Sequence, residues 1–251
     1  MEHLKNFLRY CILLTFLIFL ANHAYADNTA VQVPVLVYHE ILVDNDCKEV
    51  GETVITLEKF AKQMKFLYDH GYYSISMDEL VQFMKGGSVP EKSILIHFDD
   101  GWKSVKYAIP ILEQYEFKAS FWIITEKGIG NDNLEWEDVI TIDHNPDFEV
   151  GSHTMTHPWD RLSNLLTWVQ GKIPGKGIKD AEWELRESKK ILEQKLNRKV
   201  PYLAWPRGWY NDTLIQIAKE VGYKALLTID VGGNTQGGDI FRIKRVMVNG
   251  A

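Results

Sequence analysis

The stretch that decides the fold is "SILIHFDDG", residues 93–101. Its nearly continuous apolar run, "SILIHF", is typical of a parallel strand that is buried on both faces. The run leads directly into Asp99 and Asp100, followed by Gly101. Two adjacent carboxylates at the mouth of a buried strand repel each other and lose water, which disfavours their charged forms. We therefore expect a bound cation to offset this charge.

The same alternation of apolar runs and amphipathic stretches continues along the chain and predicts an α/β fold. We expect a distorted or incomplete (β/α) barrel of about seven parallel strands, because full eight-fold barrels take about 250 residues. A doubly wound open sheet is the alternative, but no G-x-G-x-x-G follows the first apolar run. The pattern predicts strands at 33–41, 72–77, 93–98, 118–125, 148–154, 202–206, 223–230 and 241–249, and helices at 56–71, 76–87, 104–117 (kinked near Pro110), 135–142, 179–197 and 211–222.

Composition fits one large globular domain. The chain has 251 residues, of which 45% are hydrophobic and 25% charged, and a net charge of −6. An acidic chain is not expected to bind nucleic acid.

Residues 1–26 have the basic, apolar and small-residue regions of a signal peptide, so we expect an exported protein that is periplasmic, surface-bound or secreted, with its domain at 27–251. An uncleaved anchor is the alternative reading of this segment. Removing it leaves Cys47 as the only cysteine, so we expect no internal disulfide.

Polar residues follow several of the predicted strands. In a (β/α) barrel the carboxyl ends of the strands gather on one face, where active sites lie. Residues scattered by chance would fall at both ends of the strands. The residues that fall at this edge are His39, Asp99, Asp100, His153, Pro206, Arg207 and Asp230.

The segment "GSHTMTHP", residues 151–158, adds two imidazoles, His153 and His157. With Asp100 they form a set of three protein ligands that leaves a position open for water, the pattern of catalytic zinc sites. Zinc is our first expectation for the metal, with cobalt or nickel as alternatives. Asp99, held beside the cation, would stay ionised and accept a proton from water.

"IHFDDG" and "GSHTMTHP", about fifty residues apart, resemble the first two motifs of the polysaccharide deacetylases, the NodB-homology domain of carbohydrate esterase family 4. The resemblance covers roughly residues 33–249. It implies that Asp99 is the general base and that Asp100, His153 and His157 bind a divalent metal. It also implies hydrolysis of N-acetyl groups on a polysaccharide.

Further segments resemble the branch that acts on poly-β-1,6-N-acetylglucosamine of biofilm matrix. "VPVLVYHEI" at 33–41 resembles its N-terminal segment, which implies a circularly permuted barrel with His39 as the general acid. "AWPRGWYN" at 204–211 resembles the third motif, where the residue after Pro206 contributes a backbone N–H to the oxyanion. Many members have an aromatic residue at that position, and this chain has Arg207. "TIDVGGN" resembles the fourth motif, in which Asp230 would orient Arg207 or Arg245, although Asp before glycines is also common in plain turns.

Flat aromatic side chains stack well on sugar rings, and the chain has eight tryptophans. We expect a sugar platform from those that flank the motifs, namely Trp102, Trp159, Trp205 and Trp209. We expect Trp122, Trp168 and Trp183 in the core. The insertion at 158–179 is read as a surface excursion, with a lid or an apolar surface near a membrane as alternatives.

The sequence thus predicts a monomeric, metal-dependent N-deacetylase of an extracellular N-acetylated polysaccharide, with peripheral contact to the membrane or cell envelope left open. A peptidoglycan or chitin-oligosaccharide deacetylase is the nearer alternative. A non-catalytic glycan-binding domain on the same fold is the alternative from another class. A glycosidase is disfavoured because its two carboxylates would flank the scissile bond, whereas Asp99 and Asp100 are adjacent.

Overall fold

The computed structural model describes residues 31–43, 53–126 and 131–248. The expected signal peptide at 1–26 and Cys47 lie outside these ranges. Among the residues that are described, no helix combines the length and the apolar character needed to cross a bilayer.

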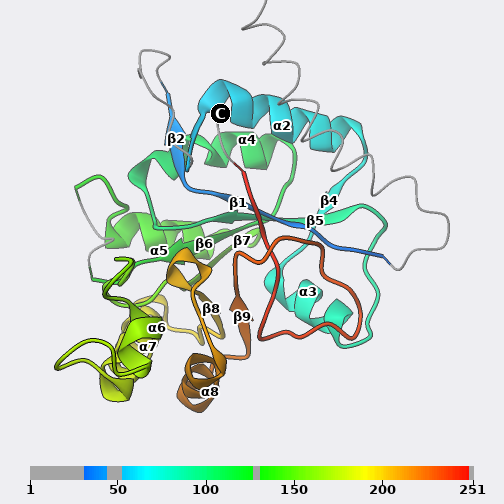
Figure 1. Ribbon diagram of the computed structural model, residues 1–251. Helices are drawn as coiled ribbons and strands as arrows, with labels where there is room; N and C mark the ends of the chain where they lie inside the picture. Colours follow the sequence, from blue (N-terminus) through cyan, green and yellow to red (C-terminus); the bar gives the residue numbers. More distant parts are fainter. Residues whose placement is uncertain (1–30, 44–52, 127–130, 249–251) are drawn as a thin grey trace, which may run out of the picture.

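The centre of the molecule is a curved parallel sheet with helices around its outside (Figure 1). Along the described chain the strand order is β10-β1-β5-β6-β7-β8-β9, and β4 pairs with β5 off this path. From β5 to β9 the strands follow one another in chain order without reversal, which is the winding of a barrel rather than of a doubly wound sheet. The strands are β1 (Val35–Tyr38), β4 (Tyr73–Ser74), β5 (Ser93–Phe98), β6 (Ala119–Ile123), β7 (Phe148–Ser152), β8 (Tyr202–Ala204), β9 (Ala225–Leu227) and β10 (Val246–Met247).

The C-terminal segment brings the two edges of the sheet together. Ile243 forms a parallel bridge with Leu227 of β9, and Val246 pairs in parallel with Leu36 of β1. The segment, red in Figure 1, therefore runs from beside β9 to beside β1. This arrangement confirms the expected distorted (β/α) barrel of seven parallel strands, with β4 as an additional short strand.

Both faces of the central strands are buried, which is why β5 reads as a continuous apolar run. On the inner face, Leu95 packs with Trp122 and Ala204, while on the outer face Ile96 and Phe98 pack under the helices. Gly151 in β7 makes room for the indole, because a Cβ atom there would lie 2.2 Å from Cζ3 of Trp122.

The helices begin at the capping residues that the sequence offers. Ser76 and Glu79 form the expected capping box, and the Asn211 side chain accepts a hydrogen bond from the Leu214 N–H. The helices are α2 (Leu57–Asp69), α3 (Met77–Met84), α4 (Ile109–Gln114), α5 (Trp136–His144), α6 (Leu165–Val169), α7 (Ile178–Leu196) and α8 (Asp212–Val221), with 3₁₀ turns η1 (Lys103–Tyr107) and η2 (Pro206–Gly208).

Two expectations about local structure need correction. The predicted kinked helix at 104–117 is a 3₁₀ turn, η1, followed by the separate helix α4, with Pro110 in its first turn. Proline suits a first turn because the N–H that it lacks would have no partner there. The predicted strand at 33–41 is two strands, β1 and β2 (Glu40–Leu42), and β2 pairs with β3 (Val54–Thr56).

Candidate active site

The carboxyl ends of four neighbouring strands meet at one edge of the barrel. Tyr38 is paired with Phe98, and Ile123 with Ser152, so the two strands of each pair end at the same level. The residue that follows each of three strands carries a titratable side chain: His39 after β1, Asp99 after β5 and His153 after β7. The expected convergence of strand ends on one face is therefore present.

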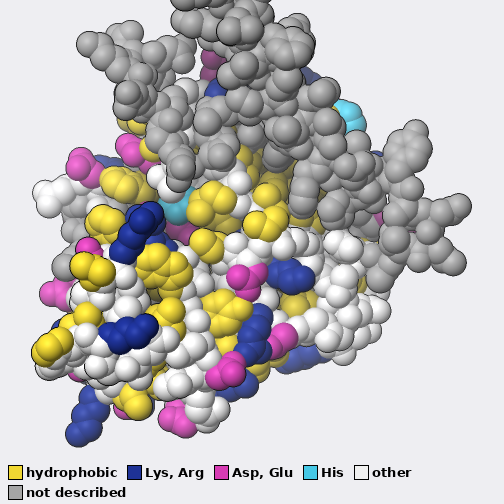
Figure 2. Space-filling view, in the orientation of Figure 1, with side chains coloured by type: hydrophobic (Ala, Val, Ile, Leu, Met, Phe, Trp, Pro, Cys, Tyr) yellow, Lys and Arg dark blue, Asp and Glu magenta, His cyan; other side chains and the backbone are white. Residues whose placement is uncertain are grey.

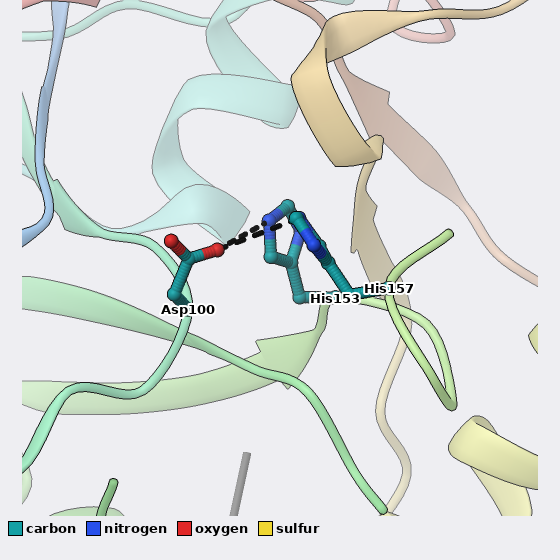
Figure 3. Close-up of side chains that lie close together, drawn as sticks. All are labelled: Asp100, His153 and His157. Carbon is teal, nitrogen blue, oxygen red and sulfur yellow. Dashed lines mark ion pairs between the residues drawn. The ribbon is translucent and has the colours of Figure 1, made fainter. Parts of the chain in front are cut away.

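Asp100, His153 and His157 lie together at this edge (Figure 3). Each offers one ligand atom, and these atoms all lie within 4.8 Å of one another. The Oδ1 atom of Asp100 is 3.3 Å from His153 Nε2 and 3.4 Å from His157 Nε2. Two imidazole nitrogens and a carboxylate oxygen around one point are the donor set of a catalytic zinc site.

The surroundings of these side chains fit a cation. His153 Nδ1 lies 2.8 Å from the Ala204 carbonyl oxygen and donates to it, which directs the lone pair of Nε2 into the site. The Trp102 indole N–H donates to Oδ2 of Asp100, leaving Oδ1 for the site. Burial lowers the pKa of His157 to about 3, aided by the neighbouring His153, so this imidazole is neutral as a ligand must be.

Charged neighbours shift the pKa values of the site residues when no metal is bound. Burial raises the pKa of Asp100, but hydrogen bonding and attraction to His153 outweigh it and lower that pKa to about 2. Burial lowers the pKa of His153, but Asp99 and Asp100 outweigh burial and raise it above its ordinary value. The carboxylates thus favour the protonated form of His153, and a bound cation would favour the neutral form instead.

Asp99 is held by Arg245, an interaction that the sequence analysis did not identify. The guanidinium donates from Nη1 to Oδ1 at 2.8 Å and from Nη2 to Oδ2 at 2.9 Å. Its Nε donates to the Thr228 carbonyl oxygen. Both side chains are almost fully buried, at 3% exposure for Asp99 and 1% for Arg245. Burial raises the pKa of the Asp99 carboxyl, but Arg245 and His153 outweigh burial and hold it well below its usual range.

Several site residues have a left-handed backbone, which is costly for residues other than glycine. The φ angles are 71° at Asp100, 68° at Thr154, 52° at His157 and 51° at Arg207. Thr154 is β-branched, so its conformation is the least favourable of the four. Backbone strain of this kind persists only where the surroundings hold it in place.

Glu184, on α7, holds the loop between the two histidines. Its carboxylate accepts hydrogen bonds from the N–H groups of Met155, at 3.0 Å, and Thr156, at 2.8 Å, and from the Thr156 hydroxyl. Glu184 is only 2% exposed. Glu184 is not among the site residues expected from the sequence, although it is a glutamate at a position that otherwise belongs to the apolar face of the longest helix.

His39 is 8% exposed, and its Nδ1 atom is buried without a hydrogen-bond partner among the described groups. Burial lowers the pKa of His39, while the charges of Asp99 and Asp100 oppose that shift. The Asp99 N–H donates to the carbonyl of Tyr38, the residue before His39. His39 therefore stands at the site, as expected from its position in the sequence.

Two expectations about the remaining site residues are wrong. Trp205 is fully buried and packs with Leu203 and Leu226, so it cannot stack on a sugar. The Asp230 carboxylate orients neither arginine. It accepts a hydrogen bond from the Tyr210 hydroxyl at 2.6 Å, whereas Arg245 pairs with Asp99. Only the backbone carbonyl of Asp230 bonds to Arg245, through the Arg245 N–H.

Arg207 and Pro206 lie in η2, directly after β8. Pro206 is buried, and the Arg207 side chain is exposed. The guanidinium of Arg207 lies over the rings of Trp159, at 5.2 Å, and Trp209, at 5.7 Å. Trp122 and Trp168 are in the core as expected, whereas Trp183, which we also expected there, is 46% exposed.

The chain is similar to known polysaccharide deacetylases. The model of the polysaccharide deacetylase family matches residues 86–226. A poly-beta-1,6-N-acetyl-D-glucosamine N-deacetylase of Staphylococcus aureus strain MSSA476 is 25% identical over 205 residues, covering 80% of this chain and 70% of the relative.

Two solved structures have the same fold. The Streptococcus pyogenes deacetylase PplD, in complex with acetate, superimposes with a TM-score of 0.75 at 25% identity, covering 88% of this chain and 94% of the other. IcaB from Ammonifex degensii gives a TM-score of 0.75 at 26% identity, covering 88% and 93%. The family model spans more than half of the chain and includes the whole Asp100–His153–His157 cluster. The chain therefore belongs to the polysaccharide deacetylase family.

Proposed function

We propose that this deacetylase removes N-acetyl groups from N-acetylglucosamine residues of an exported polysaccharide, with poly-β-1,6-N-acetylglucosamine as the first candidate. The observation that carries the proposal is the convergence of Asp100, His153 and His157 beside the buried carboxylate of Asp99. The similarity to the Staphylococcus aureus enzyme supports the choice of polymer. We further propose that the domain at 27–251 acts as a monomer outside the cytoplasm after removal of residues 1–26.

Asp100, His153 and His157 are the residues that would hold a divalent cation, zinc first and cobalt or nickel as alternatives. Such a cation supplies Lewis acidity, which polarises the acetyl carbonyl and lowers the pKa of a nearby water. The cluster fits because the hydrogen bond from His153 Nδ1 to Ala204 directs Nε2 toward Asp100.

Each remaining side chain has a role that follows from its surroundings. Asp99, kept ionised by Arg245, takes a proton from the water that attacks the acetyl carbon. The N–H of Arg207 is a donor for the oxyanion of the tetrahedral intermediate. His39 gives a proton to the departing nitrogen as the C–N bond breaks. The products are acetate and a glucosamine unit.

A peptidoglycan or chitin-oligosaccharide deacetylase would use the same residues on a β-1,4-linked chain. A non-catalytic glycan-binding domain would not need them. The buried Asp99–Arg245 pair supports an enzyme, because isolating a carboxylate beside three potential metal ligands is costly and contributes nothing to sugar binding by itself.

Acetate release by residues 27–251 tests the proposal. The protein is first stripped with a chelator and then loaded with zinc, cobalt or nickel. Oligomers of β-1,6-linked and β-1,4-linked N-acetylglucosamine and intact peptidoglycan are compared as substrates. We expect release only from metal-loaded protein and fastest release from the β-1,6 oligomers.

Asp99→Asn is the matched variant for the catalytic role, because it keeps the shape of the side chain. We expect it to bind the metal with the wild-type stoichiometry and to lose acetate release. Wild-type turnover by Asp99→Asn would refute the base assignment. Release of acetate from peptidoglycan alone would move the substrate to the alternative class.

A further inference from the structure

A cavity of about 500 Å³ opens beside the metal cluster, on the side of the insertion at 158–179. His157 forms part of its wall, together with Trp159, Asp160 and Lys176 from the insertion and Trp183 and Glu184 from α7. The insertion is therefore part of the surroundings of the site rather than a remote surface excursion. A cavity of this size is ample for a hexopyranose ring.

Two tryptophans in the wall of this cavity are unusually accessible. Trp159 is 55% exposed and Trp183 is 46% exposed. Exposed indoles leave a large apolar surface in water, which is unfavourable unless a ligand covers it. Figure 2 shows hydrophobic and basic side chains gathered beside a histidine on this face of the molecule.

Trp159 is held in place although it is exposed. The guanidinium of Arg207 lies over its ring at 5.2 Å, and a backbone bridge joins Trp159 to Asn164. Asn164 also caps α6, accepting a hydrogen bond from the Thr167 N–H. A ring fixed before binding loses less conformational entropy when a ligand arrives.

The insertion carries its own internal support. The Asp160 carboxylate accepts hydrogen bonds from the N–H groups of Leu162 and Ser163, and the Trp168 indole N–H donates to the Ser163 hydroxyl. Lys176 lies over the Trp168 ring at 4.6 Å and pairs with Asp180. The segment thus forms a fixed wall rather than a loose loop.

The polar groups of the cavity favour a sugar over a lipid surface. Asp160 is an exposed carboxylate, which an anionic membrane would repel, and the surface is hollow rather than convex. A sugar ring presents apolar C–H faces to the indoles and hydroxyl groups to carboxylate and ammonium groups. The combination of two exposed indoles with the exposed Asp160 carboxylate and Lys176 suits a neutral pyranose.

We infer that the cavity between the 158–179 insertion and α7 is a sugar-binding subsite, which takes a pyranose unit of the polymer next to the unit that is deacetylated. The inference rests on the proposed function and extends it. It assigns a role to the insertion, and it makes Trp159 and Trp183 specificity-determining residues. It also predicts that the enzyme recognises a length of chain and not a single N-acetylglucosamine unit.

Kinetics with oligomers of increasing length test this inference. For zinc-loaded Trp183→Ala on a tetramer of β-1,6-linked N-acetylglucosamine, we expect KM to rise about tenfold with kcat within about twofold, the signature of lost uniform binding. We expect little change on the monosaccharide, which does not reach the subsite. Trp159→Ala should behave in the same way, whereas Trp183→Phe keeps an aromatic ring and should retain most of the affinity.

Tyr68→Ala is the matched control, because Tyr68 is an aromatic residue of α2 with 57% exposure that packs against Tyr115 and not in the cavity. Its KM values should equal those of the wild type. An unchanged KM for Trp183→Ala at every oligomer length, or an equal rise for monosaccharide and tetramer, would overturn the subsite.

A binding measurement separates this inference from the proposed function. Tetramer is titrated into metal-free protein while tryptophan fluorescence is recorded. A saturable change that is lost in Trp183→Ala supports the subsite even if no oligomer is deacetylated, in which case the proposed function alone fails. Deacetylation without any tetramer-dependent change overturns the subsite alone. Binding to vesicles of phosphatidylglycerol and phosphatidylethanolamine that requires both tryptophans, with no response to tetramer, would assign the surface to membranes instead.

Discussion

Arg245→Met breaks the buried pair that holds Asp99, the proposed general base. Methionine fills a similar length of space but cannot donate a hydrogen bond, so Asp99 keeps its charge without its two guanidinium bonds at 2.8 and 2.9 Å. Both side chains are removed from water, with exposures of 3% and 1%. The variant therefore leaves a desolvated carboxylate without its main partner.

The expected loss of stability follows from this burial. Removing one partner of a buried ion pair costs about 3–5 kcal/mol, because the other charge stays buried and uncompensated. For a domain of this size, that loss lowers Tm by on the order of 10 °C. Differential scanning calorimetry of the metal-free protein measures it without interference from ligand binding.

The double variant Asp99→Asn/Arg245→Met provides the decisive comparison. Both charges are then absent, so the desolvation penalty disappears and the stability should return close to that of the wild type. If the two single losses simply add in the double variant, or if Arg245→Met has the wild-type Tm, the pair does not have the energetic role that its geometry indicates.

The same variant should move the acid limb of the pH–rate profile. Arg245 lowers the pKa of Asp99 against the opposing effect of burial. Without the guanidinium, burial raises that pKa, so Asp99 takes up a proton at a higher pH. We expect kcat/KM of Arg245→Met to fall off at higher pH than in the wild type. An identical acid limb in both proteins would contradict Asp99 as the base.

Three other variants test further parts of the molecule. Gly151→Ala should cost about 1–3 kcal/mol of unfolding free energy by urea denaturation, because its Cβ would lie 2.2 Å from Trp122; unchanged stability would show that the indole can move. Glu184→Ala should weaken cobalt binding, measured by visible absorption, about 10–100-fold. Glu184→Gln keeps one oxygen that can accept from both loop N–H groups and should retain most of the affinity. Equal affinity in all three proteins would dismiss Glu184 as a positioning residue. The pKa of Asp100 is about 2 in the metal-free fold, below its value in the unfolded chain. The ionised Asp100 therefore stabilises the fold fully above pH about 4, and this contribution is lost as pH falls toward 2. In calorimetry, Asp100→Asn should remove this part of the acid sensitivity, and an unchanged acid sensitivity would contradict the lowered pKa.

The sequence by itself was sufficient for the α/β class, for most strands and helices, and for the cluster of candidate metal ligands. Each of these residues could be placed from the sequence next to it, because Asp99 and Asp100 directly follow β5 and His153 directly follows β7. The ends of parallel strands in a barrel meet on one face, so residues at these positions are brought together by topology alone. Because the strands are buried on both faces, their sequences are almost continuously apolar, and this pattern predicts them.

Only the tertiary structure determined which partners these residues have. Arg245 and Asp99 are separated by 146 positions, and no local pattern indicates that the C-terminal segment carries its arginine to the end of β5. Glu184 reaches the histidine loop from another element for the same reason. The indole of Trp205 is buried while that of Trp183 is exposed, because packing between elements, and not proximity to a motif, decides which aromatic face meets solvent.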